Sequence, residues 1–530
     1  MGHLEKMLSP LKHERRLAVC DAARSEVHQL VVVKHASIFV NTGTEATRIL
    51  NELTTKGPIY NAYRFFMNQP DLFASDHDAW KARFDVMGEA LNNITMPNED
   101  SITKDLMAAL NKASESGEPV EICKICSLMA FDVVAEAVFG YKLGAVSGSE
   151  EGEKLFQSLE SLAEKQSGEG LYANPQARKI SAEEEAEAKA TWKAFITKCL
   201  DVLMTEVESN NSSKAAVFGK ALREFAQADA LKAPQDERNE VERQAMFAEI
   251  HQIMRHGQES IGGMLVWLLV SLHQWPEARQ TLEKAIKEEY MGGAYPEYLE
   301  CFLKETLRRY PTCGNMTVRT VDKEGFVAKG GYPIAINTPI FMHIFSLQNT
   351  GREWHKARDF WPERWLASNT DKKGVNMKNE PTPYAPKCPF AAIGAQKSVT
   401  DLNASRSHKE TAYSGLGHRD GSLSYLPFGA GARVCSGRHL GLQVMRKFLL
   451  DVATAYRLNP AEKASMDIDP GAAVQATIVP LMKASTLLKV SRIGGGETGL
   501  GADVKTIKKE ETAEDGWADD SDEEVPDLTD

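Results

Sequence analysis

The chain has 530 residues, of which 42% are hydrophobic and 26% are charged, a balance that is typical of globular proteins and excludes a fibrous or wholly disordered chain. Its net charge of −12 is concentrated at the C-terminus, because residues 510–530 contain eleven acidic residues and no Lys or Arg, which leaves −1 on the rest of the chain. A nearly neutral body excludes the basic footprint of a nucleic-acid-binding protein, and no apolar run reaches the roughly 18 residues of a membrane-spanning helix.

The first half of the chain is predicted to be largely helical, with one β-hairpin near its start. Residues 28–40 are rich in Val and Ile and are interrupted at Lys34–Ser37, which predicts two short paired strands. Residues 144–153 and 166–185 are rich in Gly, Ser and Glu, which predicts loops, and a charged helix should follow them. Apolar residues recur at helical spacing in four further segments, 1–25, 42–53, 76–91 and 121–140.

The second half contains the longest predicted helix, two strand regions and two polar segments. The helix spans about 243–273, and Pro276 marks the start of its successor. Residues 367–424 are rich in Ser, Asn, Lys, Gly and Pro, and we interpret them as a surface insertion. Residues 494–530 have few apolar side chains and end in an acidic run, which predicts a disordered tail. Short strands are expected within 316–327 and 332–344.

The most informative motif surrounds Cys435, which lies among glycines just before an amphipathic segment that predicts a helix. A sulfur close to a helix start meets unpaired amide donors and the positive end of the helix dipole, and both favour the thiolate. The pattern Phe428-x-x-Gly431-x-Arg433-x-Cys435-x-Gly437 resembles the haem-binding loop of the cytochrome P450 family.

This resemblance implies a mainly α fold with a small β region, in which residues 1–493 form one haem domain. It implies that Cys435 is the axial ligand of a haem b iron, as a thiolate that pushes electron density onto the iron and favours O–O cleavage. Arg433 should pair with a haem propionate. Arg83 comes one residue earlier than in the family's Trp-x-x-x-Arg pattern. The other cofactor contacts that the resemblance implies are Phe428, Gly431, Gly437, His439, Arg319, Trp80 and Arg83.

A second motif, Glu305-x-x-Arg308, lies in a predicted helix that ends at Tyr310-Pro311. The three-residue spacing stacks the carboxylate and the guanidinium on one helical face. The run Phe360–Trp365 follows, and the family places an arginine like Arg364 against such a pair. A buried, bidentate network of these three residues would hold the cysteine loop in place. Its disruption should therefore abolish haem incorporation rather than alter the choice of substrate.

A third motif, HGQES at 256–260, lies in the longest predicted helix. Its distance from Pro276 matches that expected for the oxygen-activating helix of the family. Gly257 should weaken the helix locally and leave a groove for dioxygen. Glu259 and Ser260 occupy the acid and alcohol positions, and the resemblance implies that they deliver protons during oxygen activation.

Two residues of this helix depart from the family pattern, since Arg255 replaces an apolar residue and His256 replaces a small one on the side expected to line the pocket. With Gln252 and Ser260, His256 forms a polar stripe at i, i+4 spacing. Three interpretations stay open. His256 turns aside and bonds a backbone carbonyl, or Arg255 and His256 bind an acidic group of the substrate. In the third, His256 closes on the iron as a sixth ligand in the resting state.

The function implied by these motifs is that of a haem-thiolate monooxygenase. Such an enzyme would insert one oxygen atom from O2 into a small organic substrate, either lipophilic or acidic. No Gly-rich flavin or nicotinamide motif stands between a strand and a helix, so electrons should come from NAD(P)H through a separate reductase or ferredoxin. The alternatives are a haem-thiolate enzyme that rearranges hydroperoxides, which usually lacks the acid–alcohol pair, and a non-catalytic haem sensor or carrier.

We expect a monomer that binds no nucleic acid. The eight cysteines are scattered, which suits a reducing compartment. Without a signal or transmembrane segment, the expected location is cytoplasmic. The endoplasmic reticulum membrane is the alternative if the N-terminus is truncated, because eukaryotic members of the family usually carry an N-terminal anchor.

Overall fold

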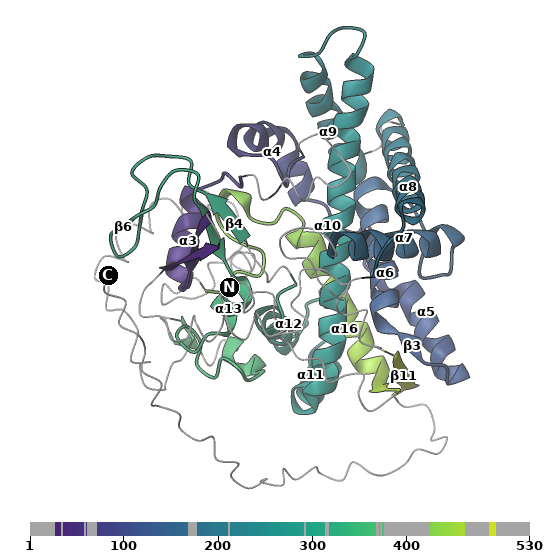
Figure 1. Cartoon of the computed structure of the whole chain (residues 1–530). Helices are drawn as coiled ribbons and strands as arrows, with labels where there is room; N and C mark the ends of the chain where they lie inside the picture. Colours follow the sequence, from purple (N-terminus) through teal and green to yellow (C-terminus); the bar gives the residue numbers. More distant parts are fainter. Residues whose placement is uncertain are drawn as a thin grey trace. The chain divides into compact units, whose positions relative to one another are not determined.

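Two long helices in contact form the centre of the fold (Figure 1). Helix α10 (Arg238–Gln274) is 37 residues long, and it packs against α6 (Ile122–Phe139). Most residues of α6 are buried, as expected for a helix that is apolar on all sides. Helices α9 (Lys214–Ala230) and α16 (Arg438–Ala455) also contact α10. This arrangement buries the middle of α10 between the N-terminal and C-terminal parts of the sequence.

Helices α10 and α6 approach closely at Gly257. A Cβ at this position would lie 2.9 Å from Cγ2 of Val134 on α6. Helix α10 is continuous through this point. The glycine therefore permits close packing of the two helices without interrupting α10.

The structure is a computed structural model that describes residues 27–32, 35–57, 60, 71–167, 178–209, 212–290, 293–312, 317–366, 370–371, 374–375, 424–461 and 487–493. The predicted helix at 1–25, nearly all of the predicted insertion at 367–424 and the predicted tail at 494–530 lie outside these residues. Among the helices that are described, none is both long enough and apolar enough to cross a membrane.

The other described helices and strands surround this centre, and their bounds follow in chain order. The helices are α3 (Gly43–Glu52), α4 (His77–Asn92), α5 (Ser101–Ser116), α7 (Glu150–Ser167), α8 (Ala182–Glu208), α11 (Pro276–Glu289), α12 (Glu297–Arg309) and α13 (Ile344–Asn349), with 3-10 turns η2 (Pro362–Trp365) and η4 (Gly431–Arg433). The strands are β1 (Val27–Val32), β2 (His35–Val40), β3 (Val120–Glu121), β4 (Thr317–Thr320), β5 (Val327–Ala328), β6 (Tyr332–Pro333), β7 (Pro339–Met342), β8 (Thr370–Asp371), β9 (Gly374–Val375), β10 (Tyr456–Pro460) and β11 (Leu487–Arg492).

The largest described sheet has the strand order β1-β2-β7-β4. Strands β1 and β2 form the predicted antiparallel hairpin, and β2 pairs in parallel with β7, with Phe39 opposite Phe341. Strand β4 pairs antiparallel with β7, with Arg319 opposite Ile340. The mainly α fold with a small β region is confirmed.

Two predicted loop boundaries and one helix boundary are wrong. Helix α7 begins inside the predicted loop 144–153, and α8 begins inside 166–185. Three glutamates lie in the first turn of each helix, where the helix dipole favours negative charge: Glu150, Glu151 and Glu153 in α7, and Glu183, Glu184 and Glu185 in α8. Helix α10 begins five residues before the predicted position 243, because its first turns are polar and do not show the apolar spacing of the rest.

Candidate active site

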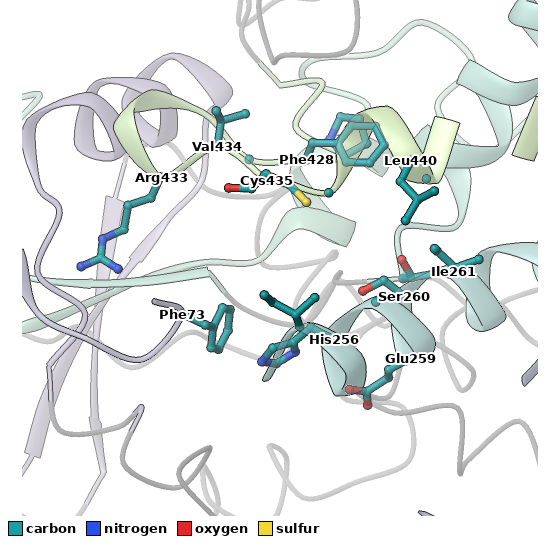
Figure 2. Close-up of a pocket in the computed structure, with 18 of the residues that line it drawn as sticks. Phe73, His256, Glu259, Ser260, Ile261, Phe428, Arg433, Val434, Cys435 and Leu440 are labelled. Atoms are coloured by element: carbon teal, nitrogen blue, oxygen red, sulfur yellow. The ribbon is translucent and has the colours of Figure 1, made fainter. Parts of the chain in front are cut away.

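A cavity of about 440 Å³ separates the loop before α16 from the middle of α10. Cys435 lines it on the loop side, and Ser260 lines it on the α10 side (Figure 2). The two residues come from segments far apart in the sequence, so only the tertiary fold brings them together. The volume falls within the roughly 300–1,000 Å³ range of small-molecule and cofactor sites.

The loop that carries Cys435 is folded back on itself. The Cys435 amide donates a hydrogen bond to the carbonyl oxygen of Phe428 at 3.0 Å, and the Val434 amide donates to that of Gly431 at 3.1 Å. The Cys435 side chain is exposed to the cavity, and α16 begins three residues later, at Arg438. Phe428 and Gly437 line the same wall. The sulfur is thus presented close to a helix N-terminus, where the thiolate is favoured.

Gly431 holds this loop against α3 and is not among the described residues that line the cavity. Its φ is +72°, in the left-handed region, and a Cβ there would collide with the carbonyl oxygen of Leu50 on α3. Gly429 has nearly the same φ, +71°, but a Cβ there would meet nothing within 4 Å. Both glycines therefore adopt a left-handed backbone conformation, but only Gly431 also lies too close to Leu50 to accept a side chain.

We expect Gly431→Ala to destabilise the protein more than Gly429→Ala. Both changes carry a backbone cost of about 1–2 kcal/mol, and the clash with Leu50 adds about 1–3 kcal/mol at Gly431 alone. Unfolding of both variants by urea, with haem content measured in parallel, checks the difference. Equal losses in the two variants would show that the approach to α3 is unimportant.

Two arginines bring positive charge to the cavity wall. The Arg433 guanidinium lies 4.6 Å from the ring centroid of Trp80 and donates to the carbonyl oxygen of Ser75. Burial and the nearby Arg319 lower the pKa of Arg433 to about 9. The buried Nε of Arg433 has no hydrogen-bond partner among the described residues. Arg319 is 3% exposed and donates to the carbonyl oxygens of Leu53 and Val318.

Two expected cofactor contacts do not reach the cavity. The Arg83 Nε donates to the Glu249 carboxylate at 2.9 Å, and its guanidinium lies over the Phe225 ring, so the side chain is directed into the helical packing. His439 is not a lining residue either, whereas its neighbour Leu440 is, because successive positions of α16 point in different directions. Trp80, one turn before Arg83, does line the cavity.

Glu259 and Ser260 both line the cavity from α10. Figure 2 shows Ser260 on the side of the helix that faces Cys435, with the Glu259 carboxylate pointing away from the sulfur. Burial raises the pKa of Glu259, and the nearby Arg255 opposes this shift. Glu259 is therefore a group that can hold a proton closer to neutral pH than an exposed glutamate does.

The polar stripe on α10 lines the cavity at Gln252, His256 and Ser260, whereas Arg255 does not. Gln252 Nε2 donates to Asp71 Oδ2 at 3.0 Å. The centroids of the His256 and Phe73 rings lie 4.0 Å apart (Figure 2). Burial, with the positive charges of Arg255 and Lys56, lowers the pKa of His256 well below its usual value. At neutral pH the histidine is therefore uncharged.

Glu305, Arg308 and Arg364 come together in a buried network. Arg308 donates to both oxygens of Glu305, from Nε at 3.0 Å and from NH2 at 2.9 Å. Arg364 Nε donates to the same carboxylate at 3.0 Å, and Trp365 Nε1 donates to it at 2.9 Å. Burial alone would raise the pKa of Glu305, but the positive charges of Arg308 and Arg364 hold it below its usual value.

The network reaches the cysteine loop through Gln348. Arg308 donates to the Gln348 carbonyl oxygen at 2.8 Å, and the Gln348 side-chain amide donates to that of Leu307 at 3.0 Å. Its side-chain oxygen accepts from the Leu426 amide at 2.8 Å, nine residues before Cys435. The Gln348 side chain thus connects α12 directly to the start of this loop.

Sequence reasoning missed two parts of the site. Lys56 lines the cavity although it follows α3 in a segment without a motif. Leu72 and Phe73 line it too, and the Leu72 amide donates to Glu249 of α10 at 2.9 Å. Burial and the nearby Asp71 raise the pKa of Glu249 to about 8, against the effect of Arg83. No local pattern in the sequence indicated these positions.

Comparisons with known proteins agree on one family. A family model described as "Cytochrome P450" matches residues 24–392 and 412–481. The chain is 22% identical over 447 residues to "Probable cytochrome P450 4p3" of Drosophila melanogaster, covering 80% of this chain and 76% of that protein. It is 24% identical to "Steroid 17-alpha-hydroxylase/17,20 lyase" of Mesocricetus auratus, covering 40% of this chain and 34% of that protein.

A solved structure described as a cytochrome P450DA heme domain has a similar fold. The TM-score is 0.60 at 16% sequence identity, and the match covers 87% of this chain and 90% of the other. The chain matches less than two thirds of several curated relatives, including 38% of the "Psoralen synthase" of Pastinaca sativa.

Proposed function

The chain belongs to the cytochrome P450 family of haem-thiolate monooxygenases, and we propose that Cys435 is its iron ligand and that it inserts one oxygen atom from O2 into a small lipophilic or acidic substrate. The observation that carries this proposal is the shared cavity, which is lined by Cys435 on one side and by Glu259 and Ser260 on the other. An iron-ligating sulfur and a pair of proton-exchanging groups are the parts that oxygen activation requires.

The residues around the cavity fit a haem. The Cys435 side chain is exposed to the cavity, and the Arg433 Nε on the same wall is buried without a hydrogen-bond partner among the described residues. Arg319 adds a second buried cation. Cys435 would hold the iron, Arg433 and Arg319 would bind the propionates, and Phe428 would contact the macrocycle.

When bound, the haem supplies O2 activation, which a thiolate ligand favours by donating electron density. Cys435 contributes that thiolate near the N-terminus of α16, where the helix dipole stabilises negative charge. Burial raises the pKa of Glu259, so its carboxyl group holds a proton to a higher pH than an exposed glutamate does. Ser260, which faces Cys435, can pass a proton from its Oγ towards the cavity.

The rest of the wall suits a substrate with an apolar body. The described lining includes Leu72, Phe73, Phe84, Leu91, Val134, Val138, Ile253, Ile261, Met264 and Leu440. Because the chain has no flavin or nicotinamide motif, we propose that a separate reductase or ferredoxin supplies the electrons from NAD(P)H. We propose a monomer with one haem domain that ends near residue 493.

The proposal is tested by the difference spectrum of the reduced protein with carbon monoxide. The band characteristic of thiolate ligation should be present, and its absence in folded, haem-loaded protein would contradict the proposal. Turnover that requires O2 and a reductase supports a monooxygenase. Turnover of a fatty-acid hydroperoxide without either would instead indicate the rearranging enzyme, and a six-coordinate iron that no ligand displaces would indicate a sensor or carrier.

We expect His256→Ala to leave the resting optical and EPR spectra unchanged. The His256 ring packs against Phe73, so its position is explained without an iron bond. The neutral imidazole implied by its lowered pKa could nevertheless act as a ligand, which makes the spectrum decisive. A change from six-coordinate to five-coordinate iron in the variant would show that His256 is the sixth ligand. Phe73→Leu, which removes the packing partner alone, is the control.

A further inference from the structure

Lys56 is a buried basic side chain on the cavity wall that the proposed mechanism does not use. Its side chain is 6% exposed, and its Nζ lies 3.6 Å from the ring centroid of Phe73 and 4.5 Å from that of Tyr60. Among the described residues its Nζ forms neither a hydrogen bond nor an ion pair. Aromatic faces attract a cation but do not replace the hydrogen bonds that it loses on burial.

The acidic residues nearest Lys56 are committed to other groups. Asp76 Oδ1 accepts from the backbone amides of Lys56 and Gly57, at 3.3 and 3.0 Å. Asp71 accepts from the Ala74 amide at 2.7 Å and from Gln252 at 3.0 Å. Burial and the positive charges of Arg319 and Arg433 lower the pKa of Lys56 well below its usual value, although Asp71 and Asp76 oppose this from a distance, without an ion-pair contact. The Lys56 amine therefore remains available to an anion that enters the cavity, and the charge of that anion would favour its protonation.

The charges around the cavity leave room for one more anion. Lys56, Arg319 and Arg433 are three basic side chains on its wall. A haem brings two propionates, which can balance the two arginines. Of the lining acids, Glu249 is already held by Arg83 and by the Leu72 amide, and burial raises the pKa of Glu259, which disfavours its charged form. Lys56 is the basic side chain left without a counter-charge among these groups.

We propose that Lys56 binds the carboxylate of an amphipathic acid substrate, whose apolar body extends across the cavity towards Ser260 and Cys435. This inference rests on the proposed monooxygenase function and names its substrate class. Lys56 and the α10 residue His256 both contact the Phe73 ring, so the anion site lies beside Phe73. A charged hydrogen bond in such a dry site is stronger than one in water.

Lys56 takes over the role that the sequence suggested for Arg255 and His256. Arg255 does not line the cavity, and His256 is uncharged at neutral pH because burial and two neighbouring cations lower its pKa. A neutral imidazole can donate one hydrogen bond to a carboxylate but contributes no charge. His256 can therefore donate a hydrogen bond to the anion, and protonated Lys56 would supply the positive charge that balances the anion.

The test compares dodecanoate with dodecan-1-ol, which share an apolar chain and differ in charge. Binding to the haem-loaded protein is measured by the shift of the haem absorption band, in the wild type, Lys56→Met, Lys56→Arg and Lys323→Met. Lys323 is the matched control, because it also lies beside a phenylalanine ring, that of Phe326, but its side chain is half exposed, away from the cavity. Loss of haem to apomyoglobin is followed in parallel.

We expect Lys56→Met to weaken dodecanoate binding about tenfold or more and to change dodecan-1-ol binding less than about twofold. Lys56→Arg should retain most of the preference for the acid, and Lys323→Met should behave as the wild type. An unchanged ratio of acid to alcohol affinity in Lys56→Met would overturn the proposal. Faster loss of haem from Lys56→Met, with the ratio of acid to alcohol affinity unchanged, would also overturn the proposal, because Lys56 would then bind a haem propionate.

The wild-type spectra separate this inference from the function on which it rests. If the reduced protein lacks the thiolate band with carbon monoxide, both proposals fall. If the band is present but the wild type binds dodecanoate no more tightly than dodecan-1-ol, only the role of Lys56 falls.

Discussion

Replacing Cys435 with alanine should abolish the thiolate band of the reduced protein with carbon monoxide and reduce O2-dependent turnover to background. The cavity offers no second thiol, since Cys435 is the one cysteine among its described lining residues. Oxygen and nitrogen ligands do not supply the electron density with which a thiolate favours O–O cleavage. The measurement is the carbon monoxide difference spectrum of protein reconstituted with haem to equal content.

Cys301→Ala is the matched control. Cys301 is buried in α12 and does not line the cavity, and burial raises the pKa of its thiol to about 12. This variant should keep the band and the turnover. A Cys435→Ala protein that retains the thiolate band would show that another cysteine holds the iron. The cavity lined by Cys435 would then not be the haem site.

Glu305→Gln should destabilise the protein by about 3–5 kcal/mol and strongly reduce the amount of haem-loaded protein. The change leaves Arg308 and Arg364 buried without their counter-charge, and both are almost wholly inaccessible to solvent. The effect should extend to the cysteine loop, because Arg308 binds the Gln348 carbonyl and the Gln348 side chain binds the Leu426 amide. Unfolding by guanidinium chloride and haem content per folded chain measure the two effects.

Glu300→Gln on the same helix distinguishes this network from an ordinary ion pair. Glu300 pairs with Arg446 at 2.6 Å, but both side chains are about one-quarter exposed. An ion pair with this access to water contributes at most about 1 kcal/mol. If Glu300→Gln lost as much stability and haem as Glu305→Gln, the network would have no special role.

The sequence predicted the parts of the molecule whose signals are local. The hairpin at 28–40, helix α6 and the start of α11 at Pro276 follow from the spacing of apolar residues and from one proline. Glu305 and Arg308 lie one turn apart on α12, a spacing visible in the sequence, whereas Arg364, 59 residues after Glu305, was expected only from the resemblance to the family. Apart from Arg364, each of these signals lies in a few neighbouring residues.

The sequence did not show where a distant partner decides the position of a residue. Arg83 turns to Glu249, which lies 166 residues away in the sequence. Gly431 lies against the carbonyl oxygen of Leu50 on α3 and does not line the cavity. The helical spacing at Arg83 and the backbone freedom of Gly431 were visible in the sequence, but their neighbours were not.

By itself, then, the sequence determined the family, the mainly α fold and the cysteine expected to hold the iron, because periodicity and motif spacing are properties of neighbouring residues. Only the tertiary structure decided which side chains share the cavity with that cysteine. It removed Arg83, Arg255 and His439 from the wall and added Lys56. The reason is physical, since a buried charge takes its position from whatever the packing of distant helices and loops brings beside it.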